Sequence, residues 1–183
     1  MADDVARVRE FLNKDAANKW GFVIYRCTYG DDDAWNRFMK HLDERTRLNL
    51  ETYNASDLFS RIDWSVVHDA DLEGADSEDV RTYNNSRRFS IWKQNSAEKD
   101  NWSGIPRYHA CIRVDKFFMD AVLEGPPANE FDDIGMGFVE LISLDASKGE
   151  TFAGLSYLVP RIYVPPDGPG WENFAVRDDV ATP

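Results

Sequence analysis

Four short runs of apolar residues alternate with segments of helical periodicity, which restricts the chain to folds that combine a sheet with helices. The runs are rich in β-branched and aromatic side chains, which favour strands. They lie at residues 22–28, 64–68, 107–114 and 137–144. The sequence therefore predicts four strands.

The segments between these runs carry apolar residues at intervals of three and four, as amphipathic helices do. The clearest case follows the acidic residues 31–33, which can cap a helix and offset its dipole. Its apolar stripe consists of Trp35, Phe38, Met39 and Leu42. Further helices are predicted near the N-terminus, at about 77–92 and at 115–123.

The resulting order, a helix followed by β-α-β-α-β-α-β, predicts a single α+β domain over residues 1–183. The expected arrangement is ferredoxin-like, a split β-α-β sheet of about four strands with helices on one face and an additional N-terminal helix. An open doubly wound sheet is the alternative. Residues 155–164 predict a short edge strand interrupted by Pro160, and a Pro- and Gly-rich irregular tail is expected from about residue 165.

The charge of the chain excludes some classes of partner. Its 33 acidic and 21 basic residues give a net charge of −12, which argues against binding the phosphate backbone of nucleic acid. No run of apolar residues approaches the length of a membrane-spanning helix, and the N-terminus lacks the pattern of a secretory signal. Cys27 and Cys111 each lie in a strand-like run, as reduced core thiols of a cytoplasmic protein would.

Three segments carry a resemblance to a known family. The first is the stretch Trp-Gly-Phe-Val-Ile-Tyr-Arg-Cys-Thr-Tyr at 20–29, which is followed by the acidic run and Trp35. The other two lie at 63–67 and 106–115. In these features the chain resembles an uncharacterised protein family of filamentous ascomycete fungi, over roughly residues 18 to 145. The resemblance implies a fungal origin and a common fold, but it carries no activity, cofactor or catalytic residue.

Motifs for metals and cofactors are incomplete. The segment that begins at Asp69 mimics the first half of an EF-hand loop, but Val80 stands where a bidentate glutamate is needed. The acidic run 31–33 is better explained as a helix start. The histidines and cysteines are not spaced for zinc, and the glycine patterns of phosphate-binding loops are missing. We therefore expect neither a metal nor a cofactor.

One polar constellation remains, and it depends on the sheet. In the third predicted strand His109, Cys111 and Arg113 share one face because side chains alternate along a strand. If the first strand lies beside the third, Tyr25 and Cys27, or alternatively Arg26, join that face. Two further polar residues interrupt the other strands, His68 and Glu140. The candidate site is His109, Arg113, Tyr25, His68 and Glu140, with Arg113 as charge partner and His109 as proton carrier.

Three interpretations of this face stay open. It can be a solvated sheet surface, a surface that binds a protein or small-molecule partner, or the site of a cofactor-independent lyase, isomerase or cyclase around His109 and Arg113. We take an intracellular binding protein as the leading hypothesis and the enzyme as its alternative. A homodimer through the sheet face is a further expectation. A closed pocket around His109 and Arg113 would favour the enzyme, and a flat exposed face the binding protein.

Overall fold

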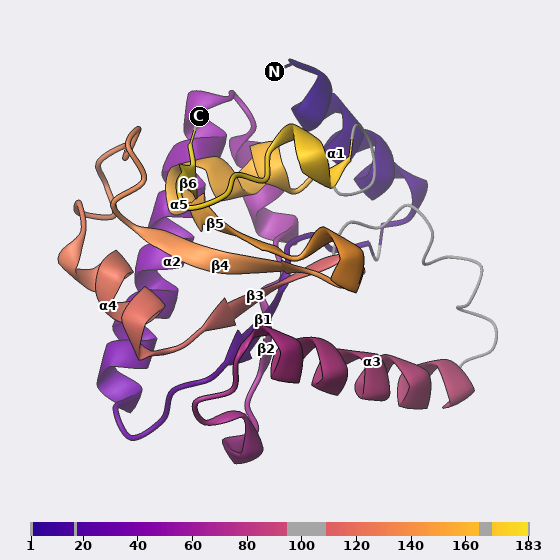
Figure 1. The fold of residues 1–183 in the computed structure, drawn as a ribbon. Helices are drawn as coiled ribbons and strands as arrows, with labels where there is room; N and C mark the ends of the chain where they lie inside the picture. Colours follow the sequence, from indigo (N-terminus) through magenta and orange to yellow (C-terminus); the bar gives the residue numbers. More distant parts are fainter. Residues whose placement is uncertain (1, 17, 95–108, 165–169, 183) are drawn as a thin grey trace.

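A six-stranded mixed sheet forms the centre of the fold (Figure 1), as seen in a computed structural model that describes residues 2–16, 18–94, 109–164 and 170–182. The strands follow the order β2-β1-β3-β4-β5-β6 across the sheet. They are β1 (Val23–Arg26), β2 (Ser65–Val67), β3 (Ala110–Val114), β4 (Phe138–Ser143), β5 (Glu150–Gly154) and β6 (Val180–Ala181). The four predicted strands are all present as β1 to β4, although residues 107 and 108 lie outside the described ranges.

The sheet has a parallel half and a largely antiparallel half. β1 is parallel to both β2 and β3, whereas β3 pairs antiparallel with β4, and β4 with β5. The short β6 is parallel to β5. β1 therefore lies in the middle of a parallel β2-β1-β3 unit, and the antiparallel strands extend the sheet from β3.

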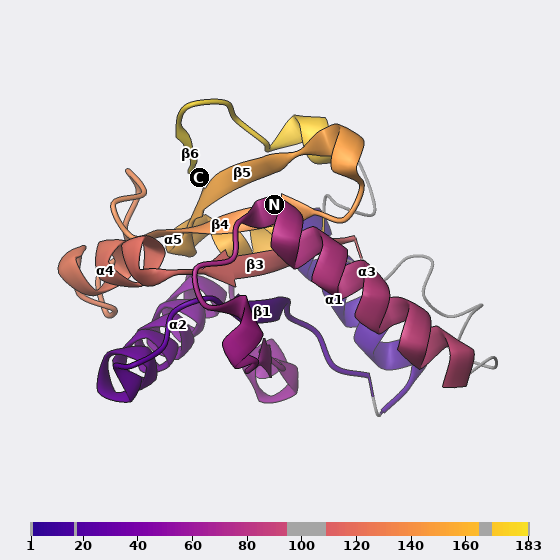
Figure 2. The same cartoon turned by 60° about the horizontal axis from the view of Figure 1, so that its bottom comes forward.

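Helices cover both faces of this sheet, which corrects the ferredoxin-like prediction of about four strands with helices on one face. α2 (Asp32–Thr52) connects β1 to β2 and α3 (Ser77–Gln94) connects β2 to β3. Because β2 and β3 lie on opposite sides of β1, right-handed crossovers place these two helices on opposite faces. Figure 2 shows α3 in front of the sheet and α2 behind it. The parallel half thus follows the doubly wound alternative.

Acidic caps define where the helices begin. The Asp31 side chain accepts a hydrogen bond from the backbone N–H of Ala34 at the start of α2. Asp115 accepts one from Phe118 at the start of α4 (Lys116–Glu124). Both carboxylates satisfy an N–H that the first helical turn leaves unpaired. The helices predicted at 31–42, 77–92 and 115–123 are confirmed as α2, α3 and α4.

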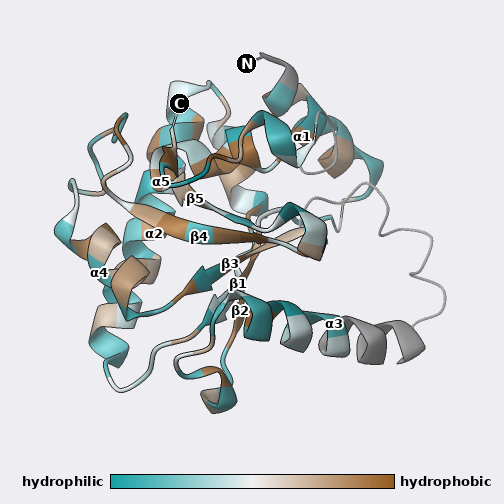
Figure 3. Ribbon diagram, viewed as in Figure 1, coloured by the Kyte–Doolittle hydropathy of each residue, from teal (hydrophilic) through white to brown (hydrophobic). Residues whose placement is uncertain are grey.

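The two faces bury side chains of different character. On the face toward α2, the core combines strand residues with α1 (Ala2–Lys14), α5 (Leu155–Tyr157) and the irregular helical segment η6 (Leu158–Ile162). On the face toward α3, a smaller cluster consists of Tyr25, Cys27, Val67, Leu72, Ala75, Val80, Cys111 and Ile142. Figure 3 shows hydrophobic residues concentrated on the strands and hydrophilic residues along α3.

The C-terminal part of the chain differs most from the prediction. Residues 155–164, predicted as an edge strand, contain the helical segments α5 and η6 instead. The strand that continues the sheet is β5, directly before them, and β6 lies within the tail that was expected to be irregular. β5 forms because the turn at Gly149, with φ of 70°, folds it back onto β4.

Candidate polar pocket on the sheet face toward α3

Three of the five predicted site residues lie side by side on the face of the sheet toward α3. The strand register pairs Tyr25 of β1 with Arg113 of β3, and Arg113 with Glu140 of β4. Side chains of directly paired residues point to the same face. The polar row Tyr25–Arg113–Glu140 therefore crosses the three central strands.

Arg113 is the centre of an ion-pair network. Its Nη1 donates to Oε2 of Glu140 at 2.8 Å and its Nη2 to Oδ2 of Asp115 at 2.7 Å. Its Nε donates to the backbone oxygen of Ala75 at 2.6 Å, in the segment before α3. One guanidinium thus serves two carboxylates, and the local charge is negative.

Glu140 lies at the floor of a pocket of about 300 Å³, which we call the Glu140 pocket. Its lining includes Glu140, Glu150, Phe152, Arg177, Asp178 and Asp179. Glu140 is only 7% exposed, and Oε2 is the oxygen that binds Arg113. No residue that the structure describes donates a hydrogen bond to the other oxygen, Oε1. Because Glu140 lines the pocket, Oε1 is the acceptor that this side chain can offer to a ligand.

Burial and ion pairing act in opposite directions on these groups. Burial raises the pKa of Glu140 above its usual 4.5, because the charged form is poorly solvated there, and the hydrogen bond and charge of Arg113 offset this only in part. Burial also tends to lower the pKa of Arg113, but the nearby carboxylates outweigh it and the pKa is raised. Arg113 therefore stays charged while Glu140 is the group that titrates more easily.

The walls of the Glu140 pocket come from β5 and from the C-terminal segment 176–179. Thr151 holds the two together, because its Oγ1 accepts a hydrogen bond from the backbone N–H of Val176 at 3.1 Å. On the side toward α3, Glu150 binds Nη2 of Arg81 at 3.2 Å. Arg81 is also bound to Glu78 and to the backbone oxygen of Ser143, so its charge too is shared between two carboxylates.

Tyr25 belongs to the same row but serves the packing of α3. Its hydroxyl donates to Oδ1 of Asn84 at 2.7 Å, and its ring meets the edge of Tyr83. The side chain is 1% exposed and does not line the Glu140 pocket. Near it, burial raises the pKa of the Cys27 thiol to about 12, which keeps this cysteine protonated.

The two histidines are not brought to the row. His109 is exposed and immediately precedes β3, four residues before Arg113, which corresponds to about 13 Å along a strand. His68 is exposed at the end of β2, where its ring lies 6.1 Å from that of Trp35 in α2. Arg26, the alternative to Tyr25, is on the face toward α2, where it stacks on Tyr29 and Trp35.

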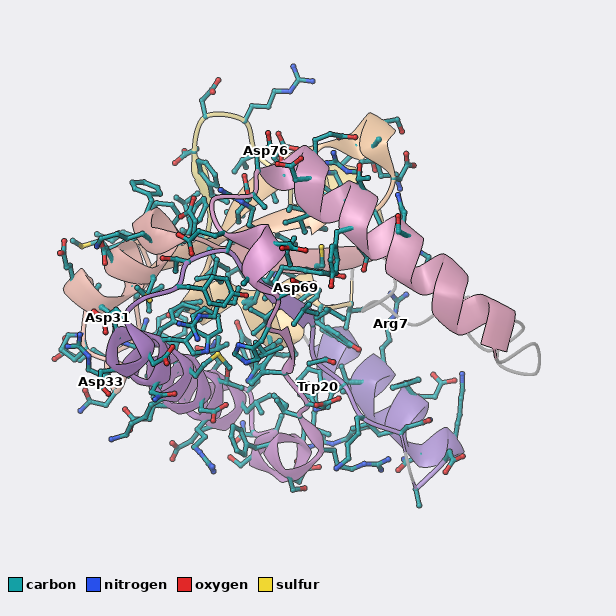
Figure 4. The ribbon with its side chains drawn as sticks, turned by 90° about the horizontal axis from the view of Figure 1, so that it is seen from below. Arg7, Trp20, Asp31, Asp33, Asp69 and Asp76 are labelled. Carbon is teal, nitrogen blue, oxygen red and sulfur yellow. The ribbon has the colours of Figure 1, made fainter. Side chains whose placement is uncertain are left out.

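A second pocket, of about 510 Å³, lies beside the start of α3, and we call it the Asp71 pocket. Its lining includes Asp71, Glu73, Ala75, Asp79, Thr82 and Tyr83. Figure 4 shows Asp76 at the start of α3, between the segment that holds Asp69 and the pale yellow C-terminal segment. The two pockets flank the first turns of α3, because Asp79 and Thr82 line this pocket while Arg81 binds Glu150, which lines the Glu140 pocket.

The acidic motif at 69–80 has a structural role. The Asp69 carboxylate accepts hydrogen bonds from the backbone of Asp71 and from the hydroxyl of Tyr83. Asp76 and Asp79 cap α3 by accepting from each other's backbone N–H. Among the described residues, no group of three or more His, Cys, Asp or Glu side chains is placed to hold a metal ion.

Sequence reasoning missed Arg81 and the pocket wall at 176–179. Arg81 lies in the helix predicted at about 77–92 and is not among the predicted site residues, and Asp178 and Asp179 lie in the tail that was expected to be irregular. Their contribution depends on β6 pairing with β5, a contact between distant parts of the sequence. The alternation of polar residues on β3 and β4 was the signal that could be found, and it identified Arg113 and Glu140.

Comparison with protein-family models, with curated proteins and with solved structures found no match to this chain. Within the ranges that the structure describes, no helix combines the length and the apolar character that crossing a bilayer requires.

Proposed function

We propose that this chain is a binding protein that holds its ligand in the Glu140 pocket. The observation that carries the proposal is Glu140 itself, a nine-tenths buried carboxylate that lines a pocket of about 300 Å³, with Oε2 bound to Arg113 and Oε1 accepting no hydrogen bond from the described residues. Burying a carboxylate costs free energy unless its oxygens are hydrogen-bonded. A ligand that donates to Oε1 would complete the pairing.

The composition of the pocket suits ligand binding. Phe152 supplies an apolar surface beside the charged groups, and the hydrogen bond between Thr151 and Val176 fixes the wall opposite Glu140. Ligand sites commonly combine an apolar wall with a few polar groups of fixed direction. A cytoplasmic protein of the fungal family that the sequence resembles is the setting we propose. Because α3 covers the sheet face, a homodimer would have to form through the rim of the pocket.

The alternative is a cofactor-independent enzyme, and one observation favours it. Burial raises the pKa of Glu140, which moves this group toward the range in which a carboxylate accepts and returns a proton during a reaction. His109 would not take part, because it lies away from the pocket. In this alternative Glu140 is the general base and Arg113 holds it in position.

The proposal is tested by screening small amines, carboxylic acids and neutral amides against the labelled protein by NMR. We expect at least one of these classes to shift the backbone signals of residues 150–152 and 176–179. Val176→Trp should fill the pocket and abolish the shifts, whereas Ile134→Trp, at an exposed apolar position outside the pocket, should preserve them. If none of the three classes shifts these signals in the wild-type protein, the binding proposal is wrong.

The same ligands separate the binding protein from the enzyme. Glu140→Gln keeps the shape of the side chain but cannot accept a proton at neutral pH. If the bound compound is converted by the wild-type protein and not by Glu140→Gln, the enzyme is correct. If neither protein converts it and both bind it, the chain is a binding protein.

A further inference from the structure

Two acidic pockets flank the start of α3, and their charges restrict what can occupy them. Four carboxylates and one guanidinium line the Glu140 pocket. The two arginines behind it do not reverse this balance, because Arg113 is shared by Glu140 and Asp115, and Arg81 by Glu78 and Glu150. An anionic ligand would be repelled, and a cationic one attracted.

Glu140 gives this attraction a defined contact. Its Oε1 is oriented by the bond between Oε2 and Arg113, and it is the acceptor that a protonated amine or a guanidinium would bind. Phe152 lies directly across from Glu140 on β5, so that its ring is on the same face. An aromatic ring next to a carboxylate favours a cation with an apolar stem, as in a lysine or arginine side chain.

The Asp71 pocket has the same character but comes from different elements. Asp71 and Glu73 belong to the segment after β2, and Asp79 to the first turn of α3. Among the residues whose side chains the structure describes, no lysine or arginine lines this pocket, while Leu72 and Ala75 supply an apolar wall. It is therefore a second place for a cationic side chain.

Arg113 lies between the two pockets. It donates to Glu140, which lines the first pocket, and to the backbone oxygen of Ala75, which lines the second. The first turns of α3 separate the pockets on the surface, because Arg81 points toward Glu150 on one side and Thr82 lines the Asp71 pocket on the other. A ligand that fills both pockets must cross this ridge and send one branch down on each side.

We propose that the ligand is a basic segment of a partner polypeptide that places one lysine or arginine side chain in the Glu140 pocket and another in the Asp71 pocket. This inference rests on the proposed function and names its ligand. A peptide backbone can cross the ridge while two side chains descend from it, whereas a linear polyamine lacks such branches. The net charge of −12 would also speed the approach of a basic partner.

The experiment compares peptides that differ only in their lysines. One set carries two lysines separated by one, three or five glycine or serine residues, and the matched peptides carry a single lysine. Calorimetry at physiological salt should show that the best two-lysine peptide binds at least about tenfold more tightly than its single-lysine counterpart, because the second contact is intramolecular. If the second lysine raises the affinity equally at all three spacings, two pockets at a fixed separation are contradicted.

Charge-matched variants locate the contacts. Asp178→Asn/Asp179→Asn removes two negative charges from the Glu140 pocket, and Asp71→Asn/Glu73→Gln removes two from the Asp71 pocket. Each double variant should bind the two-lysine peptide only as tightly as the single-lysine peptide. Glu10→Gln/Glu51→Gln removes the same charge from exposed positions of α1 and α2 and should change the affinity less than twofold. An equal loss in this control would show diffuse attraction and overturn the proposal.

Three further outcomes would also overturn the proposal. Spermidine that binds as tightly as the best peptide, with the same dependence on both pockets, would identify a polyamine site instead of a peptide site. If neutral or acidic compounds shift the signals of the Glu140 pocket while lysine peptides do not bind, this inference fails and the proposed binding function stands. If no compound of any class occupies the pocket, the proposed function itself fails.

Discussion

The two faces of the sheet are built on the same strands but use them differently. Toward α2, Phe22 and Ile24 of the first strand region are fully buried among apolar side chains. Toward α3, Tyr25 of the same strand forms a hydrogen bond with Asn84, and Arg113 of β3 forms ion pairs. The face toward α2 therefore supplies hydrophobic stabilisation, and the face toward α3 holds the charged groups that border both pockets.

The contrast extends to how each face treats a buried arginine. Arg45 of α2 is 1% exposed and donates to Ser156 Oγ and to the backbone oxygens of Pro126, Pro127 and Ala128. These acceptors are neutral and tie a loop to the helix. Arg113 instead binds two carboxylates beside a pocket. Arg45, whose acceptors are neutral oxygens, therefore has a structural role. Arg113 is shared by two carboxylates, so a net negative charge remains beside the pocket and can attract a ligand.

The largest expected difference between the faces is in packing. Phe22→Ala should lower the free energy of unfolding by about 3–5 kcal/mol, because the residue is 0% exposed and its ring packs against Tyr163. Val80→Ala, at an equally buried position of α3, removes less volume and should cost about 1–3 kcal/mol. Urea unfolding measures both. Equal losses would show that the cluster toward α3 contributes as much as the larger core.

The next effect concerns the ion pair between the pockets. Arg113→Met should destabilise the protein by about 2–4 kcal/mol at neutral pH, because it leaves Glu140 charged and buried without its partner. Adding Glu140→Gln removes that charge and should restore more than half of the loss. A double-mutant cycle measured by urea unfolding gives the coupling, and independent, additive effects of the two changes would contradict the pairing.

How much of this site the sequence predicts depends on how far apart along the chain the contacting residues are. The strand runs and the helix stripe at Trp35, Phe38 and Leu42 are local patterns, and they were predicted correctly. Arg113 was proposed because alternation along a strand identifies its face, and Glu140 because it is a polar residue in an apolar strand, although the register that pairs them comes only from the structure. His109 has the right alternation but lies before the start of β3, too far from Arg113 to join it.

The pocket itself could not be predicted, for a physical reason. Its walls require β5 to turn back onto β4 and the C-terminal segment to pair with β5. The five residues of β5 show no strong strand pattern, and β6 has only two residues, so long-range pairing and not local propensity decides their conformation. The doubly wound arrangement was predicted only as the alternative for a similar reason, since sequence order does not say on which side of β1 each crossover lies.

A smaller effect should appear in the pH dependence of stability. The pKa of Glu140 is raised in the folded protein, so the folded state binds this proton more tightly than the unfolded state. The resulting stabilisation is complete below the unfolded pKa and is lost as the pH rises through the folded pKa. Relative to Glu140→Gln, the wild-type protein should therefore lose stability as the pH rises from about 4.5. A difference that does not change with pH, measured by urea unfolding, would contradict the shift.

The smallest effect separates a structural residue of the polar row from those that line the pockets. Tyr25→Phe removes the hydrogen bond to Asn84 and should cost about 1 kcal/mol in urea unfolding. Because Tyr25 lines neither pocket, the variant should bind the two-lysine peptide as the wild-type protein does. If Tyr25→Phe lowers this affinity as much as Asp178→Asn/Asp179→Asn, the row acts as one unit and Tyr25 belongs to the site. Unchanged affinity with reduced stability would place the boundary of the site between Tyr25 and Arg113.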